Sequence, residues 1–236
     1  MGPIRWQRLA PLTGVVAVIL WAIGIAVLEG ADAPDTDSRG IVALAYFTAH
    51  EDAILAGTFV FMLGGIFFLW FAASLRSALY RMEGSLGTLA STAFAGGIAT
   101  GTCAILLPSA QATGALNNDN LSPQGAQTLL MVGDMFFYAA ELAAAVMLIA
   151  TAIVILRARA WLPVWLAWVS LLIALVLLIP PIGWAALIFG LTLWTILVAL
   201  LLYVKAPPKP GPPPLTTSFV GLGGEEEGGA DAGRAP

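Results

Sequence analysis

The stretch from Gln127 to Arg159 constrains the fold most, because it is nearly free of charge and very long. A transmembrane helix needs about 20 mainly apolar residues to cross a hydrocarbon core about 30 Å thick, and this stretch exceeds that length. The composition of the whole chain agrees, with 59% hydrophobic and only 10% charged residues. A soluble domain carries about 25% charged residues. We therefore predict an integral membrane protein.

Apolar runs with the length of membrane spans recur along the chain. The predicted spans cover residues 12–28, 53–75, 86–107, 127–156, 162–179 and 185–204. The first run is longer than the 7–15 apolar residues of a signal peptide, so we interpret it as an uncleaved span. Pro108 closes the third span, and Pro180, Pro181 and Gly183 predict a tight turn before the last one. The prediction is an all-α, polytopic transmembrane bundle of six spans within residues 1–206.

Basic residues fall on alternate loops between these spans. They are Arg5, Arg8, Arg76, Arg81, Arg157, Arg159, Lys205 and Lys209. The remaining loops hold mainly acids or no charge, apart from Arg39. Cytoplasmic loops of membrane proteins carry an excess of lysine and arginine. We therefore predict that both termini lie in the cytoplasm and that the protein resides in the cell (plasma or inner) membrane.

Two segments outside the spans have their own character. The acidic loop from Glu29 to Asp52 contains an apolar middle, Ile41 to Ala49, which we expect as a short helix on the membrane surface or against the bundle. Residues 207–236 are rich in proline and glycine and contain Glu225, Glu226 and Glu227. Such a segment has little to bury. We expect a disordered cytoplasmic tail that acts as a linker rather than a docking ligand.

Glu141 is the strongest candidate for chemistry, since it is the most deeply placed carboxylate. It lies about 24 Å from Arg157 along a helix that rises 1.5 Å per residue. No lysine or arginine lies at that depth on any predicted span. An unpaired carboxylate in the membrane is costly, so we expect it to face the bundle interior or water and to populate the neutral acid. It either exchanges a proton or serves as a hydrogen-bonding contact between helices.

Asp134 and Tyr138 precede Glu141 on the same predicted helix, at intervals of four and three residues. Such spacing places side chains on one helical face, so the three residues predict a polar path from the outside. On the third span, Ala93, Gly97 and Gly101 recur every four residues, and small residues let helices approach closely in lipid. We expect this span to press against the fourth and Thr100 to be a partner of Glu141.

His50, Glu51 and Asp52 stand together before the second span. They are candidates for an outer mouth that binds a cation or senses pH, because histidine titrates near neutrality. The simpler interpretation is a helix start, where acidic side chains are favourable.

The sequence lacks the residues that several classes of functional site require. Cys103 is the only cysteine and His50 the only histidine, so the sequence predicts neither a disulfide nor a metal site built on these residues. No phosphate-binding loop, nucleophile elbow, zinc-protease or dinucleotide motif is present. We therefore expect that the protein is not an enzyme, that it holds no cofactor and that it binds no nucleic acid.

The layout resembles a group of uncharacterised bacterial six-helix integral membrane proteins of the domain-of-unknown-function type, over Leu9 to Tyr203. The resemblance rests on the acidic first outer loop, the carboxylates of the fourth span, and the segment opening the fifth span. That segment reads Arg159-Ala160-Trp161-Leu162-Pro163-Val164-Trp165-Leu166-Ala167-Trp168. The group has no established activity, so the resemblance implies no catalytic residues.

The leading functional hypothesis is a small proton-linked transporter or permease-like protein that uses Glu141, with Asp134 and Tyr138 on the access path. The alternative is a non-catalytic subunit or scaffold that packs against partner membrane proteins or against a second copy. An intramembrane enzyme acting on lipid has the least support, because no nucleophile and base pair is visible. A water-accessible cavity reaching Glu141 would favour transport, and a fully hydrogen-bonded Glu141 a structural role.

Overall fold

The computed structural model describes residues 8–30, 34, 38–84, 86–158 and 161–205, and within these ranges it contains helices and no strands. The helices are η1 (Ala10–Leu12), α2 (Thr13–Glu29), α3 (Gly40–Ala49), α4 (Glu51–Glu83), α5 (Thr88–Leu116), η2 (Asn118–Asn120), α6 (Pro123–Ala158), α7 (Val164–Leu177), α8 (Pro180–Ala185), the π-helical η3 (Ala186–Leu191) and α9 (Thr192–Val204). Five helical segments are long and apolar enough to cross a membrane: Ala10–Glu29, α4, α5, α6 and Pro180–Val204. The helical fold and the presence of several helices with the length and composition of membrane spans are therefore confirmed.

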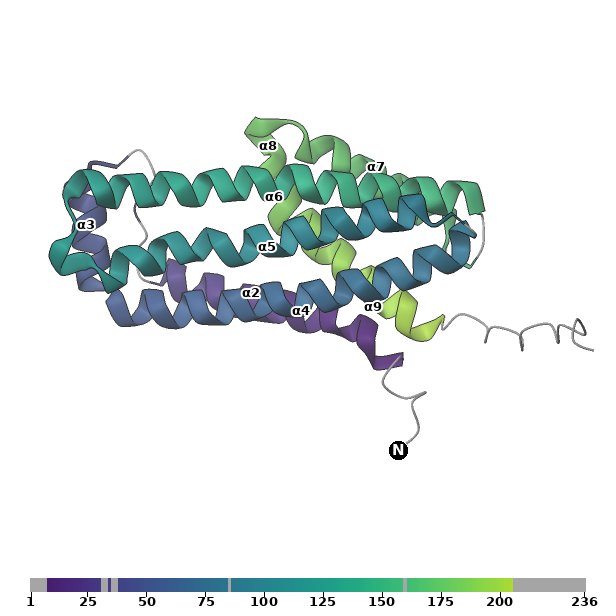
Figure 1. The fold of residues 1–236 in the computed structure, drawn as a ribbon, viewed down its shortest axis with the longest axis horizontal. Coiled ribbons are helices and arrows are strands. Elements are labelled where there is room, and N and C mark those ends of the chain that lie inside the picture. The colour runs from purple at the N-terminus through teal and green to yellow at the C-terminus, as the bar shows by residue number, and fades with distance from the viewer. Residues whose placement is uncertain (1–7, 31–33, 35–37, 85, 159–160, 206–236) are drawn as a thin grey trace, which may run out of the picture.

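The four longest helices, α2, α4, α5 and α6, lie side by side along the long axis of the molecule (Figure 1). Glycines let their backbones approach. A Cβ added to Gly96 of α5 would lie 2.7 Å from the backbone nitrogen of Met147 on α6. On the other side of α5, a Cβ on Gly101 would meet the Leu69 side chain of α4 at 2.6 Å. The expected close packing of the third predicted span against the fourth is therefore present.

The chain after α6 departs from the predicted spans. Helix α7 runs back along α6, and the segment α8–η3–α9 returns across the bundle to α2 (Figure 1). Because α7 has only 14 residues, it is about 21 Å long, less than the hydrocarbon core of about 30 Å. The predicted fifth span, 162–179, is thus a short helix, and the count of six spans stays a prediction.

Two prolines act differently from the prediction. Pro180 begins α8, since the first helical position has no intrahelical use for the N–H that proline lacks. The turn therefore falls at Leu178 and Ile179. Pro108 was expected to end the third span, but α5 continues through it to Leu116. Gly114 and Ala115 beyond the proline are buried, so packing against α3 compensates for the helical hydrogen bond that Pro108 cannot make.

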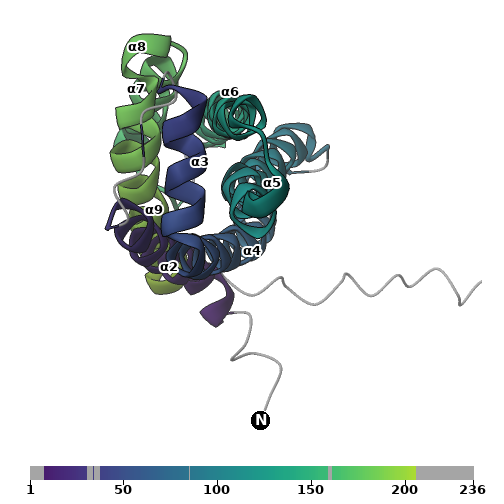
Figure 2. The same ribbon diagram turned by 90° about the vertical axis from the view of Figure 1, so that its left-hand side faces the viewer.

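Helix α3 crosses one end of the bundle, nearly at right angles to the long helices (Figure 2). Tyr46 and Phe47 of α3 form a separate small core with residues of α4, α5 and α6. The fit is close: a Cβ on Gly114 would lie 2.5 Å from the Phe47 ring, and one on Gly40 would overlap the carbonyl of Pro123. Of the two places expected for this segment, the one against the bundle is correct.

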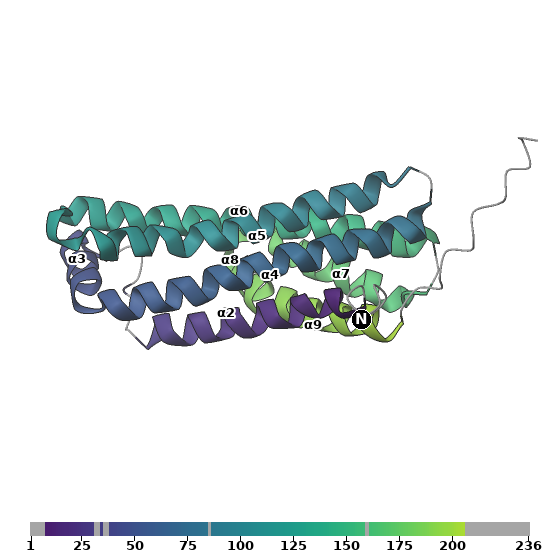
Figure 3. The same cartoon turned by 60° about the horizontal axis from the view of Figure 1, so that its bottom comes forward.

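The opposite end of the bundle gathers the basic residues. Helix α2 begins there, α9 ends there, and the α4–α5 turn lies there (Figure 3). Lys205 at the end of α9 donates a hydrogen bond to the Trp161 carbonyl before α7, at 3.4 Å. Arg8, Arg81 and Arg157 stand at the helix ends of this same side, while Glu51, Asp52 and Asp119 stand at the α3 end. The predicted tail, 207–236, and the basic residues Arg5, Arg159 and Lys209 lie outside the described residues.

Candidate functional site

Glu141 is buried in the protein interior, with 3% of its surface exposed. Its Oε1 atom has no hydrogen-bond partner among the described residues. A buried acceptor without a donor costs about 1–3 kcal/mol, and more when it is charged. Glu141 is thus a group that the fold tolerates at a cost, rather than a satisfied contact between helices.

Gly183 of α8 makes room for this carboxyl group. A Cβ on Gly183 would lie 2.9 Å from Cδ, Oε1 and Oε2 of Glu141, so no larger residue fits without displacing the acid. The π-helical segment η3 begins three residues later, at Ala186. Single π-helical turns inside α-helices occur frequently at functional sites, because they shift the hydrogen-bonding ladder. The carboxyl group therefore lies against α8, close to the irregular part of Pro180–Val204, the last segment that is long and apolar enough to cross a membrane.

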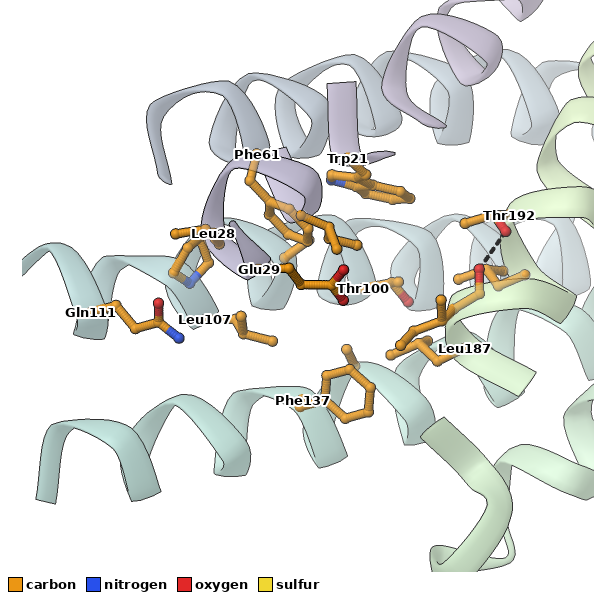
Figure 4. Close-up of a pocket in the computed structure, with 16 residues that line it drawn as sticks. Trp21, Leu28, Glu29, Phe61, Thr100, Leu107, Gln111, Phe137, Leu187 and Thr192 are labelled. Atoms are coloured by element: carbon orange, nitrogen blue, oxygen red, sulfur yellow. Dashed lines mark hydrogen bonds between the residues drawn. The ribbon is translucent and has the colours of Figure 1, made fainter. Parts of the chain in front are cut away.

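A cavity of about 260 Å³ is lined by residues of α2, α4, α5, α6, η3 and α9. Its wall includes Ala140, the residue before Glu141, and Leu187 of η3. Figure 4 shows the lining side chains, most of them apolar, with the Glu29 carboxylate directed into the space among them. Glu141 itself is not part of the described lining. The cavity thus reaches the neighbour of the buried acid.

Thr100 lines the cavity but is not bonded to Glu141. Its hydroxyl donates to the carbonyl of Gly96 on its own helix, at 2.8 Å. Thr100 nevertheless lies near the level of Glu141, because Gly96 packs against Ala143 and Met147 of the antiparallel helix α6 and Thr100 follows Gly96 by one turn. The hydroxyl turned to its own helix because a carbonyl four residues back is always within reach.

The three residues of the predicted polar path along α6 differ in how far they are exposed. Asp134 is half-buried, Tyr138 is 46% exposed on the bundle surface, and Glu141 is buried. Phe137 and Ala140, which lie between them in sequence, are the α6 residues that face the cavity. Tyr138 therefore points away from the cavity, and the side of α6 that leads inward is apolar.

The outer-mouth candidates lie at the N-terminal start of helix α4. His50 is the N-cap residue of α4, and Glu51 and Asp52 occupy its first turn. The Glu51 carboxylate accepts a hydrogen bond from Asn118 Nδ2 at 3.0 Å, and the His50 ring lies 5.7 Å from the Tyr46 ring. Acids in a first turn interact favourably with the helix dipole, which explains both of them. In the part of the chain that the structure describes, no three His, Cys, Asp or Glu side chains are grouped to hold a metal ion.

Three residues of this region were not predicted from the sequence as part of a site: Glu29, Gln111 and Gly183. Glu29 was interpreted as a loop acid, although it ends the helix that carries Trp21 and Ile25. Its spacing of eight and four residues from these two was the available signal, because it places all three on one helical face. Gly183 gave no signal, since nothing local distinguishes a glycine that faces a carboxyl group from one in a turn.

Comparisons with family models, with curated proteins and with solved structures found no match for this chain. The resemblance to bacterial six-helix membrane proteins stays a prediction, and the function is argued from the residues of the site.

Proposed function

We propose that the protein is a small proton-linked membrane transporter in which Glu141 is the group that gains and loses a proton. The observation that carries this proposal is the buried Glu141 carboxyl group, whose Oε1 has no partner among the described residues and whose preceding residue, Ala140, lines an apolar cavity. Ionisable residues inside transmembrane segments are costly and mark ion and proton pathways. A structural acid would be expected to have both oxygens satisfied.

The cavity supplies the second requirement of a carrier, a space that a small molecule can enter. In this proposal, Thr100 lines the binding space and Asp134 lies toward the outer end of α6 as part of the entry region. Tyr138 has no role inside the cavity, since it is exposed on the other side of the helix. Proton release from Glu141 requires water or a moving side chain to reach it. The irregular segment η3, which contributes Leu187 to the cavity wall, follows the α8 residue Gly183 that contacts the acid.

The membrane arrangement belongs to the same proposal: six passes, both termini in the cytoplasm, in the plasma or inner membrane of a bacterial cell. The direction of the chain supports an even number of passes, because α2 begins and α9 ends at the same end of the bundle (Figure 1). The basic residues at that end support its cytoplasmic placement. The short helix α7 would cross with the help of flanking residues 161–163 and 178–179 and local thinning of the bilayer.

The alternative, a non-catalytic subunit, loses its main sequence argument. The small residues Ala93, Gly97 and Gly101 are buried within the bundle, so they are not free to pack against a partner. What remains for this alternative is the exposed apolar face of α7, with Trp165 and Trp168. Lipid covers such a face equally well. Transport is therefore the function that the site supports best.

Proton movement into proteoliposomes tests the proposal. The purified protein would be reconstituted with a pH-sensitive dye inside, and uptake would be followed after an imposed pH gradient. We expect uptake by the wild-type protein, loss of uptake in Glu141→Gln, and wild-type uptake in the control Glu51→Gln, which removes an exposed acid at the α3 end. Equal uptake by the wild-type protein and Glu141→Gln would contradict the proposal.

A further inference from the structure

The surface of the cavity between α2, α5 and α6 is almost wholly apolar. Trp21 and Phe61 face Phe137 across it (Figure 4). The hydroxyl groups of Thr100 and Thr192, which also line it, already donate to carbonyls one turn back. Buried water needs about two to four polar partners, whereas cavities lined by apolar side chains stay dry and bind apolar molecules. The wall therefore selects for a hydrocarbon and against water or a polar solute.

The cavity has the depth of one leaflet of a bilayer. It extends along α2 from Glu29, the last residue of the helix, to Trp21, and along α5 from Gln111 to Thr100. These distances are about 12 Å and about 17 Å at 1.5 Å per residue. Half of the hydrocarbon core measures about 15 Å. With α2 across the membrane, the cavity begins near the membrane surface at the α3 end and stops near the middle of the bilayer.

The cavity is partly open rather than sealed by the described residues. Its walls on α2 and α6 belong to helices that form no packed interface with each other. Helix α3 spans the interval between them at one end of the bundle (Figure 2). The side chains of Ile25 and Leu28 on α2 and of Phe137 on α6 line the cavity and are only half-buried. The opening therefore lies on the side between α2 and α6, at a depth where lipid surrounds the protein.

From the apolar wall, the depth and the opening we propose that the cavity holds one acyl chain of a membrane lipid, which enters between α2 and α6 from the leaflet at the α3 end. A cavity of about 150 Å³ takes the six carbons of benzene, so about 260 Å³ takes roughly ten carbons of a chain. The chain gains dispersion contacts with walls that an empty cavity would leave without a partner. A free apolar solute fits the wall as well, but lipid chains are the apolar molecules that surround the opening.

This claim concerns binding alone, and no property of Glu141 enters it. That such a lipid is also carried across the membrane would be a further step, and this step rests on the proposed function.

Quenching of tryptophan fluorescence by brominated lipid tests the claim, because bromine quenches only at close range. The protein would be held in nanodiscs of a phosphatidylcholine brominated in mid-chain and compared with nanodiscs of the unbrominated lipid. Three tryptophans give the contrast. Trp70 is 61% exposed, Trp194 is 1% exposed and lies outside the cavity wall, and Trp21 is 6% exposed and lines the cavity. The contribution of each is the fluorescence that its Phe variant loses.

We expect brominated lipid to quench the Trp21 contribution as strongly as that of Trp70 and to leave Trp194 protected, because a chain inside the cavity brings bromine against the Trp21 ring. Protection of Trp21 equal to that of Trp194 would overturn the proposal. Quenching of Trp21 by aqueous acrylamide but not by brominated lipid would mean that water fills the cavity, and it would overturn the proposal as well.

Two neighbouring alanines of α6 form a matched pair. Ala140 is buried and lines the cavity, whereas Ala139 is exposed. Ala140→Phe fills part of the space and should bring the quenching of Trp21 down to that of Trp194. Ala139→Phe adds the same ring outside the cavity and should leave the quenching unchanged.

Continued protection of Trp194 in Ala140→Phe shows that the variant is folded. Unchanged quenching of Trp21 in the folded variant would mean that bromine reaches the ring from outside the cavity, which contradicts the proposal. If Ala140→Phe does not fold, the comparison of the three tryptophans in the wild-type cavity still decides it. Because the measurement needs no proton gradient, its failure is separate from a failure of the Glu141 experiment.

Discussion

Replacing Gly183 by alanine should force the Glu141 carboxyl group to move, and the size of the effect follows from the contact distances. The new Cβ would lie 2.9 Å from Cδ of Glu141, about 0.6–1.1 Å closer than an ordinary carbon–carbon contact. Overpacking of this kind costs about 1–3 kcal/mol. Alanine also favours a helix over glycine by about 1 kcal/mol. The net loss of unfolding free energy for Gly183→Ala should therefore be between about 0 and 2 kcal/mol.

A double-mutant cycle separates the two contributions. In a Glu141→Ala background the carboxyl atoms are absent, so Gly183→Ala should keep only the helical gain. The difference between the two backgrounds should be the overpacking energy alone, about 1–3 kcal/mol. The assay is unfolding in mixed micelles by added SDS, followed by tryptophan fluorescence.

Gly133→Ala is the matched control, because it adds a methyl group to α6 where the nearest neighbour, the Leu107 carbonyl oxygen, is 3.5 Å away. It should be neutral or stabilising in both backgrounds. If the coupling between positions 183 and 141 is no larger than that of the control, Glu141 does not lie against Gly183, and the description of the site is wrong.

Other predictions concern the two cores and the orientation. Tyr46→Phe removes a buried hydroxyl group that has no partner among the described residues, so it should leave the unfolding free energy unchanged or raise it by about 1 kcal/mol; a clear loss in the SDS titration would indicate a hidden partner. Ser170→Ala deprives the buried Trp194 Nε1 of its acceptor, now 2.8 Å away, and should cost about 1–3 kcal/mol in the same titration; a silent mutation would argue against the α7–α9 contact. In a Cys103→Ser background, a membrane-impermeant maleimide added to intact cells should label Asp119→Cys and spare Lys205→Cys. The reverse pattern would place both termini outside.

The positions of the long helices could be predicted from the sequence because apolar run length is a local property. Residues 53–75 and 127–156 lie within α4 and α6. The helices extend further than the runs, since nothing local ends them and the bundle covers their ends. The course of α5 beyond Pro108 depends on α3, a segment more than fifty residues earlier in the chain. Its burial of Gly114 is a tertiary effect that no local pattern encodes.

The candidate site was predictable in part for the same reason. The burial of Glu141 follows from its depth within a long apolar run and the absence of a cation at that level. Its neighbour was not predictable: Thr100 has the right depth, but its hydroxyl bonds to Gly96, while the contact of Glu141 comes from Gly183 on another helix. Side-chain direction separates Tyr138 from Glu141 as well, because three residues along a helix leave a difference of about 60° around its axis.

The central claim is that Glu141 changes its protonation state inside the membrane, and difference infrared spectroscopy tests it most directly. The protein would be measured in nanodiscs across a pH titration. Glu141→Gln would assign the carboxyl band to Glu141, and Asp134→Asn would control for the other carboxylate of α6. We expect a carboxyl C=O band that titrates between about pH 6 and 9, disappears in Glu141→Gln and persists in Asp134→Asn. The absence of any such band in that range, with Glu141→Gln folded normally, would contradict it.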